Sequence, residues 1–256
     1  RRGRSRRHGT IEDDDDGRAE PVRRERRARL TRLSRGPCPV AGADRVNATH
    51  LGIAVALIGP GVVALFSTAI ASEPETLTPR ALSLGVFVGL LVTVGLIAAR
   101  ERLGWRDVGF RCSGWLSPLW AVPVALFFIF VFRPAAFALL TILDAGSFDA
   151  GIDQFRQRPR WYLALAIVIV SAGEEWLYRD YAIERLERLT GSAWIAGTMS
   201  LAAFVLVHLP VWGPGSAATI LVSGGILTLL YIWRRDVLML ICAHVATDLW
   251  GLMRPV

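Results

Sequence analysis

Seven long apolar runs, separated by short polar segments, make up most of the chain after residue 50. An α-helix needs about 20 mainly apolar residues to cross the hydrocarbon core of a bilayer. The pattern therefore predicts an all-α fold, a polytopic transmembrane helix bundle of about seven spans, which forms one domain over residues 50–256. The runs extend over Leu51 to Ser72, Ala81 to Ala99, Leu116 to about Leu143, Trp161 onward, Ser192 to Trp212, Ala217 to Trp233, and Val237 to Met253.

The composition supports this interpretation. Hydrophobic residues make up 53% of the chain, and the mean hydropathy is +0.41. These values are typical of membrane proteins and argue against a soluble domain with a single core. We expect an integral membrane protein of a bacterial plasma membrane, in contact with lipid.

Residues 1–49 form a tail of different character, which we expect to be disordered. The tail holds 14 of the 29 basic residues, all arginines, against 8 acidic residues, and it has almost no apolar periodicity. Basic segments next to a first membrane helix usually stay on the cytoplasmic side and touch anionic lipid. We favour this interpretation over a nucleic-acid-binding arm, so no nucleic-acid partner is expected.

Ionisable side chains interrupt three of the apolar runs. Glu174 and Glu175 are adjacent in the fourth run, His208 lies in the fifth, and His244 and Asp248 lie in the last. A charge near the centre of a bilayer costs roughly 2.5 to 3.5 kcal/mol on insertion scales. Such residues therefore need a partner, a water-filled cavity or a function.

Two of these residues lie at the same distance from a turn. A helix is expected to end at Gly191, because glycine suits a helix C-terminus. Glu174 lies 17 residues before this glycine and His208 lies 17 residues after it, about 25 Å from the turn in each case. In an antiparallel helix hairpin the two side chains face each other.

His244 reaches the same depth from a second turn. It lies 8 residues beyond the turn at Arg234 to Asp236, about 12 Å into its helix. The depths agree if the charged end of the first hairpin, Arg179 to Arg188, projects about 13 Å further toward the cytoplasm. The sequence then brings the first glutamate and both histidines together below the cytoplasmic surface.

Residues four positions apart share one face of a helix. This spacing relates three pairs: Glu175 with Arg179, Phe204 with His208, and His244 with Asp248. We infer that Glu175 is held by Arg179 in an intramembrane ion pair. Glu174 points about 100° away from Glu175 and is left free toward the two histidines. Phe204 is expected to pack in the core.

This set of residues suits amide hydrolysis without a covalent intermediate. A buried carboxylate beside a histidine can hold a water molecule and remove its proton, and a second histidine can donate to the developing oxyanion. No cofactor is needed. A metal-dependent membrane hydrolase is the closest rival, because histidines and carboxylates bind zinc. The chain has no H-E-x-x-H helix, however, and we expect no metal.

Three motifs follow one another along the chain: E-E-x-x-x-R at 174–179, F-x-x-x-H at 204–208 and H-x-x-x-D at 244–248. Together they resemble the CPBP family of membrane proteases, which are the type II CaaX prenyl endopeptidases and bacteriocin-processing proteins, also called Abi. The resemblance extends over roughly residues 80–250. It includes Trp105 to Phe110, which looks like the usual inter-helix loop of the family.

The resemblance implies an intramembrane endopeptidase that acts near the cytoplasmic membrane face. Its substrate would be a protein or peptide, lipidated in the case of a prenylated CaaX tail. By this resemblance, Glu174 and His208 would activate the water. His244 and the residue at position 248 would stabilise the tetrahedral oxyanion.

Asp248 departs from the family pattern, which often has asparagine here as an amide donor. An ionised aspartate would repel an oxyanion. Asp248 must therefore be protonated, or orient His244, or impair activity. A non-catalytic membrane scaffold or immunity protein that binds a peptide in the same cavity is the alternative that this residue leaves open.

Overall fold

The computed structural model describes residues 43–70, 77–104, 116–144, 152 and 156–253, and the regular elements in these ranges are helices. From Asp44 to Val256 the chain forms one unit by its internal contacts. The tail up to residue 42 lies outside the described residues, so its disorder and its boundary with the bundle stay predictions. The Trp105 to Phe110 segment also lies outside them.

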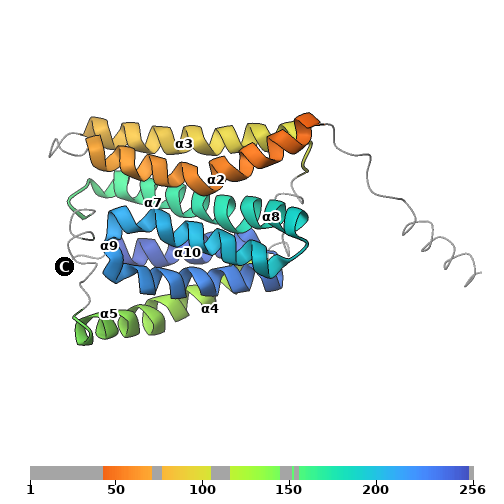
Figure 1. Cartoon of the computed structure of the whole chain (residues 1–256). Coiled ribbons are helices and arrows are strands. Elements are labelled where there is room, and N and C mark those ends of the chain that lie inside the picture. Colours follow the sequence, from red (N-terminus) through yellow and green to blue (C-terminus); the bar gives the residue numbers. More distant parts are fainter. Residues whose placement is uncertain (1–42, 71–76, 105–115, 145–151, 153–155, 254–256) are drawn as a thin grey trace, which may run out of the picture. The chain divides into compact units, whose positions relative to one another are not determined.

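Three helical stretches precede the segment that carries the motifs (Figure 1). Helices α2 and α3 are single stretches, whereas α4 continues through a short π-helical segment, η1, into α5. A continuous helix therefore passes through Arg133 and Pro134. The bounds are Ala43–Ile70 for α2, Leu77–Arg100 for α3, Leu116–Phe127 for α4, Phe128–Phe132 for η1 and Arg133–Ile142 for α5.

The remaining helices hold all the predicted site residues. Helix α7 continues through a π-helical segment, η2, into α8, and α9 and α10 follow after short turns (Figure 1). The bounds are Arg160–Glu174 for α7, Glu175–Ala182 for η2, Ile183–Thr190 for α8, Ala193–Arg234 for α9 and Val237–Met253 for α10.

The prediction of an all-α, polytopic helix bundle is confirmed. Six helical segments are long and apolar enough to cross a membrane, and α10 adds a shorter apolar helix of 17 residues. The six segments are Val46–Ser67, Thr78–Arg100, Leu116–Ile142, Arg160–Thr190, Ala193–Pro210 and Gly215–Arg234.

Helix α9 contains two of these spans and folds back on itself at Gly213. This residue has φ 74° and ψ 170°, in the region that favours glycine, and it lies between the predicted runs Ser192 to Trp212 and Ala217 to Trp233. A Cβ built on Gly197 would lie 2.8 Å from the Ile232 side chain, and one built on Gly224 would lie 3.1 Å from that of Phe204. The two halves of α9 are therefore packed closely against each other in antiparallel directions.

Both turns that the sequence singled out have the expected helix-end chemistry. Gly191 ends α8 with φ 72°, and the Ser192 hydroxyl accepts a hydrogen bond from the Ile195 N–H at 3.4 Å to start α9. The second turn passes through Arg235, which has φ 53°. Asp236 Oδ1 then accepts from the Met239 N–H at 3.1 Å and begins α10.

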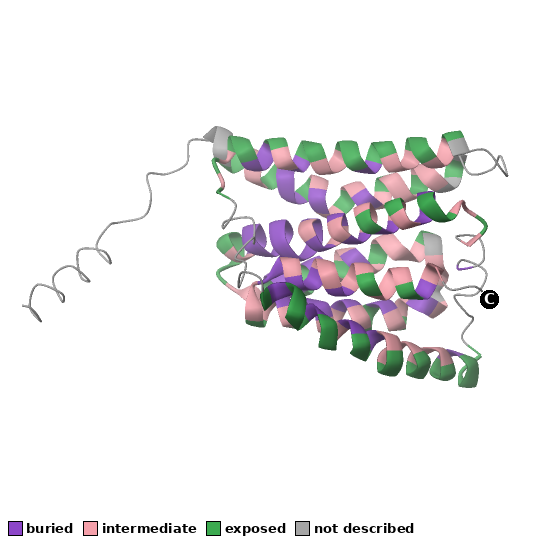
Figure 2. Cartoon of the chain, turned by 180° about the vertical axis from the view of Figure 1, so that it is seen from behind, coloured by how far each residue is buried: buried purple, intermediate pink, exposed green. Residues whose placement is uncertain are grey.

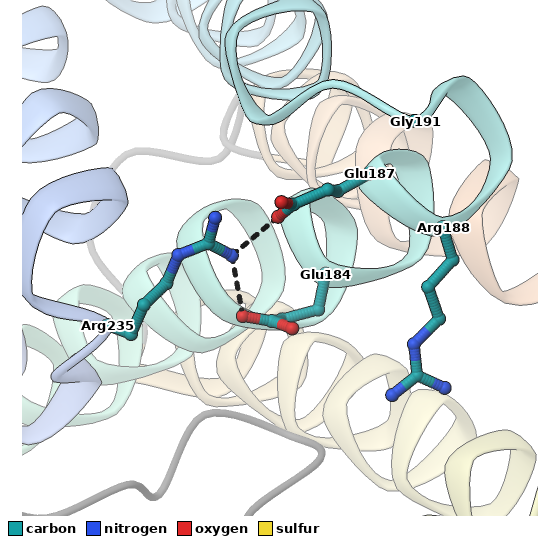
Figure 3. A pocket seen from close by; sticks show the side chains of 5 residues that line it. All are labelled: Glu184, Glu187, Arg188, Gly191 and Arg235. Atoms are coloured by element: carbon teal, nitrogen blue, oxygen red, sulfur yellow. Dashed lines mark hydrogen bonds and ion pairs between the residues drawn. The ribbon is translucent and has the colours of Figure 1, made fainter. Parts of the chain in front are cut away.

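Arg235 fixes the height of the second turn relative to the first hairpin. Its Nη1 lies 2.8 Å from Glu184 Oε1 and 2.6 Å from Glu187 Oε2, as Figure 3 shows. Burial alone would lower the pKa of Arg235, but the hydrogen bonds to Glu187 and Glu184 raise it above its ordinary value. The second turn is thus level with α8, and the Gly191 turn extends beyond it, as the helix counts predict.

The distribution of polarity is the one expected of a membrane bundle. Large apolar side chains are exposed on the outer helices, among them Leu96 on α3 and Phe130 on η1. Charged side chains such as Glu175, Arg179 and Asp180 are almost fully buried instead. Figure 2 shows the exposed residues along the outer faces and the buried ones between the helices. These buried charged side chains therefore lie in the interior of the bundle.

Candidate active site

The first motif lies at the junction of α7 and a π-helix. Glu174 is the last residue of α7, and η2 runs from Glu175 to Ala182. Single π-helical turns within α-helices occur frequently at functional sites, because the wider turn re-aims the side chains that follow it. All η2 residues except Trp176 are buried.

Glu175 and Arg179 form the ion pair that their spacing predicts. Arg179 Nη1 lies 3.2 Å from Glu175 Oε1, and the two side chains are 1% and 0% exposed. Arg179 Nη2 also donates to the Gly224 carbonyl at 3.4 Å. Neither charge is compensated by bulk water, so the pair depends on these protein contacts.

The Phe204 ring lies between Arg179 and His208. The guanidinium carbon of Arg179 is 4.0 Å from the ring centroid, and the His208 ring centroid is 4.3 Å from it. Tyr178 packs edge-on against the same ring at 5.2 Å, and its hydroxyl donates to the Leu57 carbonyl at 3.3 Å. Phe204 is a buried core residue, as expected, and it also positions one cation and one imidazole.

Glu174 faces His208 across the α7–α9 hairpin. Glu174 Oε1 lies 3.7 Å from His208 Nε2, and both side chains are 16% exposed. This separation is too long for a direct hydrogen bond and is of the kind that a water molecule bridges. The equal counts from Gly191 therefore predicted the correct pairing.

A second contact defines the tautomer of His208. Its Nδ1 lies 2.6 Å from the Phe204 carbonyl oxygen, which can only accept, so Nδ1 carries the proton. In the neutral ring, Nε2 then has a lone pair directed toward the Glu174 carboxylate. Two basic atoms thus face the same small space.

His244 binds Glu175, which corrects the expectation that both histidines face Glu174. Its Nδ1 donates to Glu175 Oε1 at 2.8 Å, and its Nε2 lies 3.3 Å from Asp248 Oδ2. The turn heights explain this contact, since Glu175 precedes Glu184 by nine residues and His244 follows Arg235 by nine. Glu175 therefore binds two side chains, those of Arg179 and His244.

Ser171 completes the site and was missed by the sequence reasoning. Its hydroxyl donates to Asp248 Oδ2 at 2.8 Å, and the side chain is buried. The sequence contained a pattern that could have indicated Ser171, because this residue lies four positions before Glu175 and so shares its helix face. Asp248 is held between this hydroxyl and His244.

Two further observations concern ligands. Within the described ranges, no group of three His, Cys, Asp or Glu side chains is arranged so that it could hold a metal ion. An open pocket of about 480 Å³ lies at the turn end of the bundle (Figure 3), and none of the predicted site residues lines it. Its lining residues are Glu184, Glu187, Arg188, Gly191 and Arg235.

Comparison with protein families gives one match. Residues 156–250 match the family model described as Type II CAAX prenyl endopeptidase Rce1-like, and this range contains all three motifs. No curated protein and no solved structure is significantly similar to the chain. The segment of this membrane protein that carries Glu174, His208 and His244 is therefore similar to the Rce1-like family of type II CAAX prenyl endopeptidases, a family of peptidases.

Proposed function

We propose that this chain is an intramembrane endopeptidase that hydrolyses a peptide bond near the cytoplasmic membrane face, with a water molecule activated by Glu174 and His208. The observation that carries the proposal is the 3.7 Å gap between Glu174 Oε1 and the basic Nε2 of His208. A water in this gap can donate one proton to each atom. The substrate is a protein or peptide, and the family match favours a prenylated C-terminal segment.

In the proposed reaction, the water oxygen attacks the peptide carbonyl carbon while Glu174 takes up its proton. The carbonyl oxygen becomes an oxyanion, which the Nε2–H of His244 stabilises. When the C–N bond breaks, the proton held by Glu174 passes to the leaving nitrogen. The products are a carboxylic acid and an amine, and no covalent enzyme intermediate forms.

Glu174→Gln tests the proposal directly. Glutamine keeps the shape of the side chain but cannot take up a proton, so we expect cleavage to fall roughly 100- to 10,000-fold while the protein stays folded. His208→Asn should lower the rate by a similar factor. The readout is the appearance of new C-terminal ends in the membrane proteome of cells that express each variant.

Asp144→Asn is the control, because Asp144 is an exposed carboxylate of the same chain that lies outside the site. It should leave cleavage unchanged. Equal cleavage by wild type and Glu174→Gln, at equal membrane abundance, would contradict the proposal that Glu174 activates the water.

Asp248 favours one alternative function, a membrane protein that binds a peptide without cutting it. Its Oδ2 faces His244 Nε2 at 3.3 Å, so the donor needed for the oxyanion already faces an anion. In that case cells that depend on the protein would keep their phenotype with Glu174→Gln and His208→Asn. Loss of the phenotype in both variants supports the peptidase.

A chelator separates the proposal from a metal-dependent hydrolase. Water activation by Glu174 and His208 needs no bound ion, so purified protein should cleave at an unchanged rate in excess chelator. A loss that added zinc restores would support the metal-dependent alternative instead.

A further inference from the structure

The last residue of α9 and the residue after it are both arginines, but their surroundings differ. Arg235 pairs with two glutamates of α8. The next residue, Asp236, accepts hydrogen bonds from the Ser117 hydroxyl at 2.6 Å and from the backbone of the first turn of α10. Arg234 pairs with no carboxylate among the residues that the structure describes. The acidic side chains at this turn are therefore bound to other groups.

Two tryptophan rings contact Arg234 instead. Its guanidinium carbon lies 4.7 Å from the ring centroid of Trp120 on α4 and 5.6 Å from that of Trp233 on α9. Within the described part of the chain, its Nε has no hydrogen-bond partner. Aromatic rings interact with the face of a guanidinium, whereas its N–H groups point outward in the plane. The two rings thus hold Arg234 in place and leave donors available to an anion.

The two rings do not belong to the core of the bundle. Trp120 is 49% exposed and Trp233 is 73% exposed. Trp233 is the second-last residue of the span Gly215–Arg234, and Trp120 lies in the first two turns of the span Leu116–Ile142. Tryptophan is enriched where a span meets the membrane surface, and arginine near a span end extends its charged head toward that surface. Arg234 and the two rings therefore lie at the level of the lipid headgroups.

Phosphate is the anionic group that a membrane offers at this level. A guanidinium fork matches phosphate oxygens and can donate two parallel hydrogen bonds to them. In phosphatidylcholine and phosphatidylethanolamine, a cation of the same headgroup competes for the phosphate. In phosphatidylglycerol the headgroup carries no cation, so the full phosphate charge is available to Arg234.

We propose that Arg234, Trp120 and Trp233 form a binding site for the headgroup of an anionic phospholipid, in the leaflet at the turn end of the bundle. The Arg234 N–H groups donate to the phosphate oxygens, and the two rings pack against the glycerol and the upper part of the acyl chains. The site lies outside the proposed peptidase site and does not depend on its activity.

Native mass spectrometry of the purified full chain in detergent tests the site. The chain is titrated with dioleoylphosphatidylglycerol and, separately, with dioleoylphosphatidylcholine, which has the same acyl chains. We expect the first phosphatidylglycerol to bind roughly 10-fold more tightly, as for a charge-assisted hydrogen bond at a membrane surface. Glycerol 3-phosphate, which has no chains to pack against the rings, should not displace the bound lipid.

Variants show whether the preference belongs to these residues. Arg234→Gln should bring the Kd values of the two lipids together. Arg234→Lys, which keeps the charge but loses the fork, should reduce the preference. Trp120→Leu should weaken phosphatidylglycerol binding, and Trp120→Phe, which keeps an aromatic face, should restore most of it. Arg100→Gln is the matched control, because it removes the same charge from an exposed arginine at the same end of the bundle.

Each outcome supports or overturns the proposal. Equal Kd values for the two lipids in the wild type would overturn the anionic site. A preference that persists in Arg234→Gln would overturn its assignment to Arg234. An equal loss in Arg234→Gln and Arg100→Gln would show a general effect of surface charge instead of a site. Displacement of the lipid by glycerol 3-phosphate would show that free phosphates, and not lipids, are the ligands.

Discussion

At the scale of single residues, His244 stands out because a carboxylate faces each of its ring nitrogens. Glu175 lies at Nδ1 and Asp248 at Nε2. A neutral imidazole has only one N–H, so donation at both nitrogens requires the imidazolium form. His244 and Arg179 then balance the charges of Glu175 and Asp248, and this balance lets Glu175 and Arg179 be fully buried.

This arrangement predicts that Asp248→Asn increases turnover. Asparagine removes a negative charge that lies beside the expected oxyanion and supplies an amide donor. The repulsion between two like charges a few ångströms apart, at a site with partial access to water, costs several kcal/mol. Asp248→Asn removes part of this repulsion between position 248 and the oxyanion, so we expect kcat to rise roughly tenfold. Steady-state kinetics with a prenylated peptide measure the change.

Ser171→Ala serves as the comparison for Asp248→Asn. It removes the hydroxyl that holds Asp248 and leaves the carboxylate charge in place. We expect no gain in kcat from this variant. If Asp248→Asn instead lowered kcat, Asp248 would act by orienting His244 rather than by hindering the oxyanion.

Glu174 and Glu175, although adjacent, are predicted to respond oppositely to substitution by glutamine. Glu175→Gln leaves the Arg179 charge buried without its counter-ion, a change that destabilises proteins by about 3 to 5 kcal/mol. The Glu174 side chain is 16% exposed, so Glu174→Gln should strongly reduce cleavage with little loss of stability. Thermal unfolding in detergent compares the two variants, and equal losses of stability would contradict the division between them.

The sequence predicted most contacts between these residues, but not all of them. The pairing of Glu174 with His208 followed from their equal distances along the chain from the Gly191 turn. The ion pair of Glu175 with Arg179 followed from their spacing of four residues in a helix. The contact of His244 with Glu175 did not follow, because an ideal helix fixes the angle between neighbours but not which one faces α10. The height of the Arg235 turn, which decides this, depends on an ion pair that no periodicity reveals.

At the scale of elements, the site depends on two helix hairpins that are held at a fixed offset. The α8–α9 turn at Gly191 extends past the α9–α10 turn, and Arg235 ties the second turn to α8 through Glu184 and Glu187. Tyr231 adds to this contact, because its buried hydroxyl lies 3.1 Å from Glu184 Oε1. A change in the offset between the two turns would shift His244 along the helix axis relative to Glu175.

Arg235→Gln is therefore predicted to weaken activity from a distance. The substitution removes two ion pairs at the turn, and we expect kcat to fall severalfold as His244 loses its register, with the Tm lower by a few degrees. Arg188→Gln, at an exposed arginine of the same pocket, is the control and should change neither quantity. A loss of stability in Arg235→Gln without any loss of kcat would show that the offset does not position the site.

The boundaries of the helices show which parts of the fold could be predicted from the sequence. Glycine at 191 and serine at 192 define a helix end and a helix start by their own backbone chemistry, and both boundaries were predicted. The π-helical segment η2 was not predicted, since its residues fit an α-helical pattern equally well. Packing against α9 and α10, rather than local preference, selects the wider turn.

At the scale of the whole molecule, the bundle has a distinct charge distribution at its turn end. Arg185 lies 3.7 Å from Glu101, and Ser117 donates to Asp236, so α3, α4 and α8 all reach this end. The described arginines here are Arg100, Arg102, Arg185, Arg188, Arg234 and Arg235, whereas the opposite end has Arg80, Arg133, Arg156, Arg158 and Arg160. This excess favours the turn end as the cytoplasmic one.

The orientation predicts which positions react with a membrane-impermeant maleimide in intact cells. After replacement of the natural cysteines 38, 112 and 242, a cysteine at Ser192 should be protected, because it lies on the cytoplasmic side. A cysteine at Trp212, beside the Gly213 fold-back, lies at the opposite end of the bundle and should be labelled. Permeabilised cells should label both, which controls for burial.

The reverse pattern would place the Gly191 and Arg235 turns outside the cell. Glu174 and His208 would then lie below the outer rather than the inner surface, about 25 Å from the Gly191 turn. Their chemistry would be unchanged, but a substrate with a prenylated C-terminus made in the cytoplasm would have to reach them across the bilayer. Labelling of Ser192→Cys in intact cells would therefore contradict the proposed substrate class while leaving the hydrolytic pair intact.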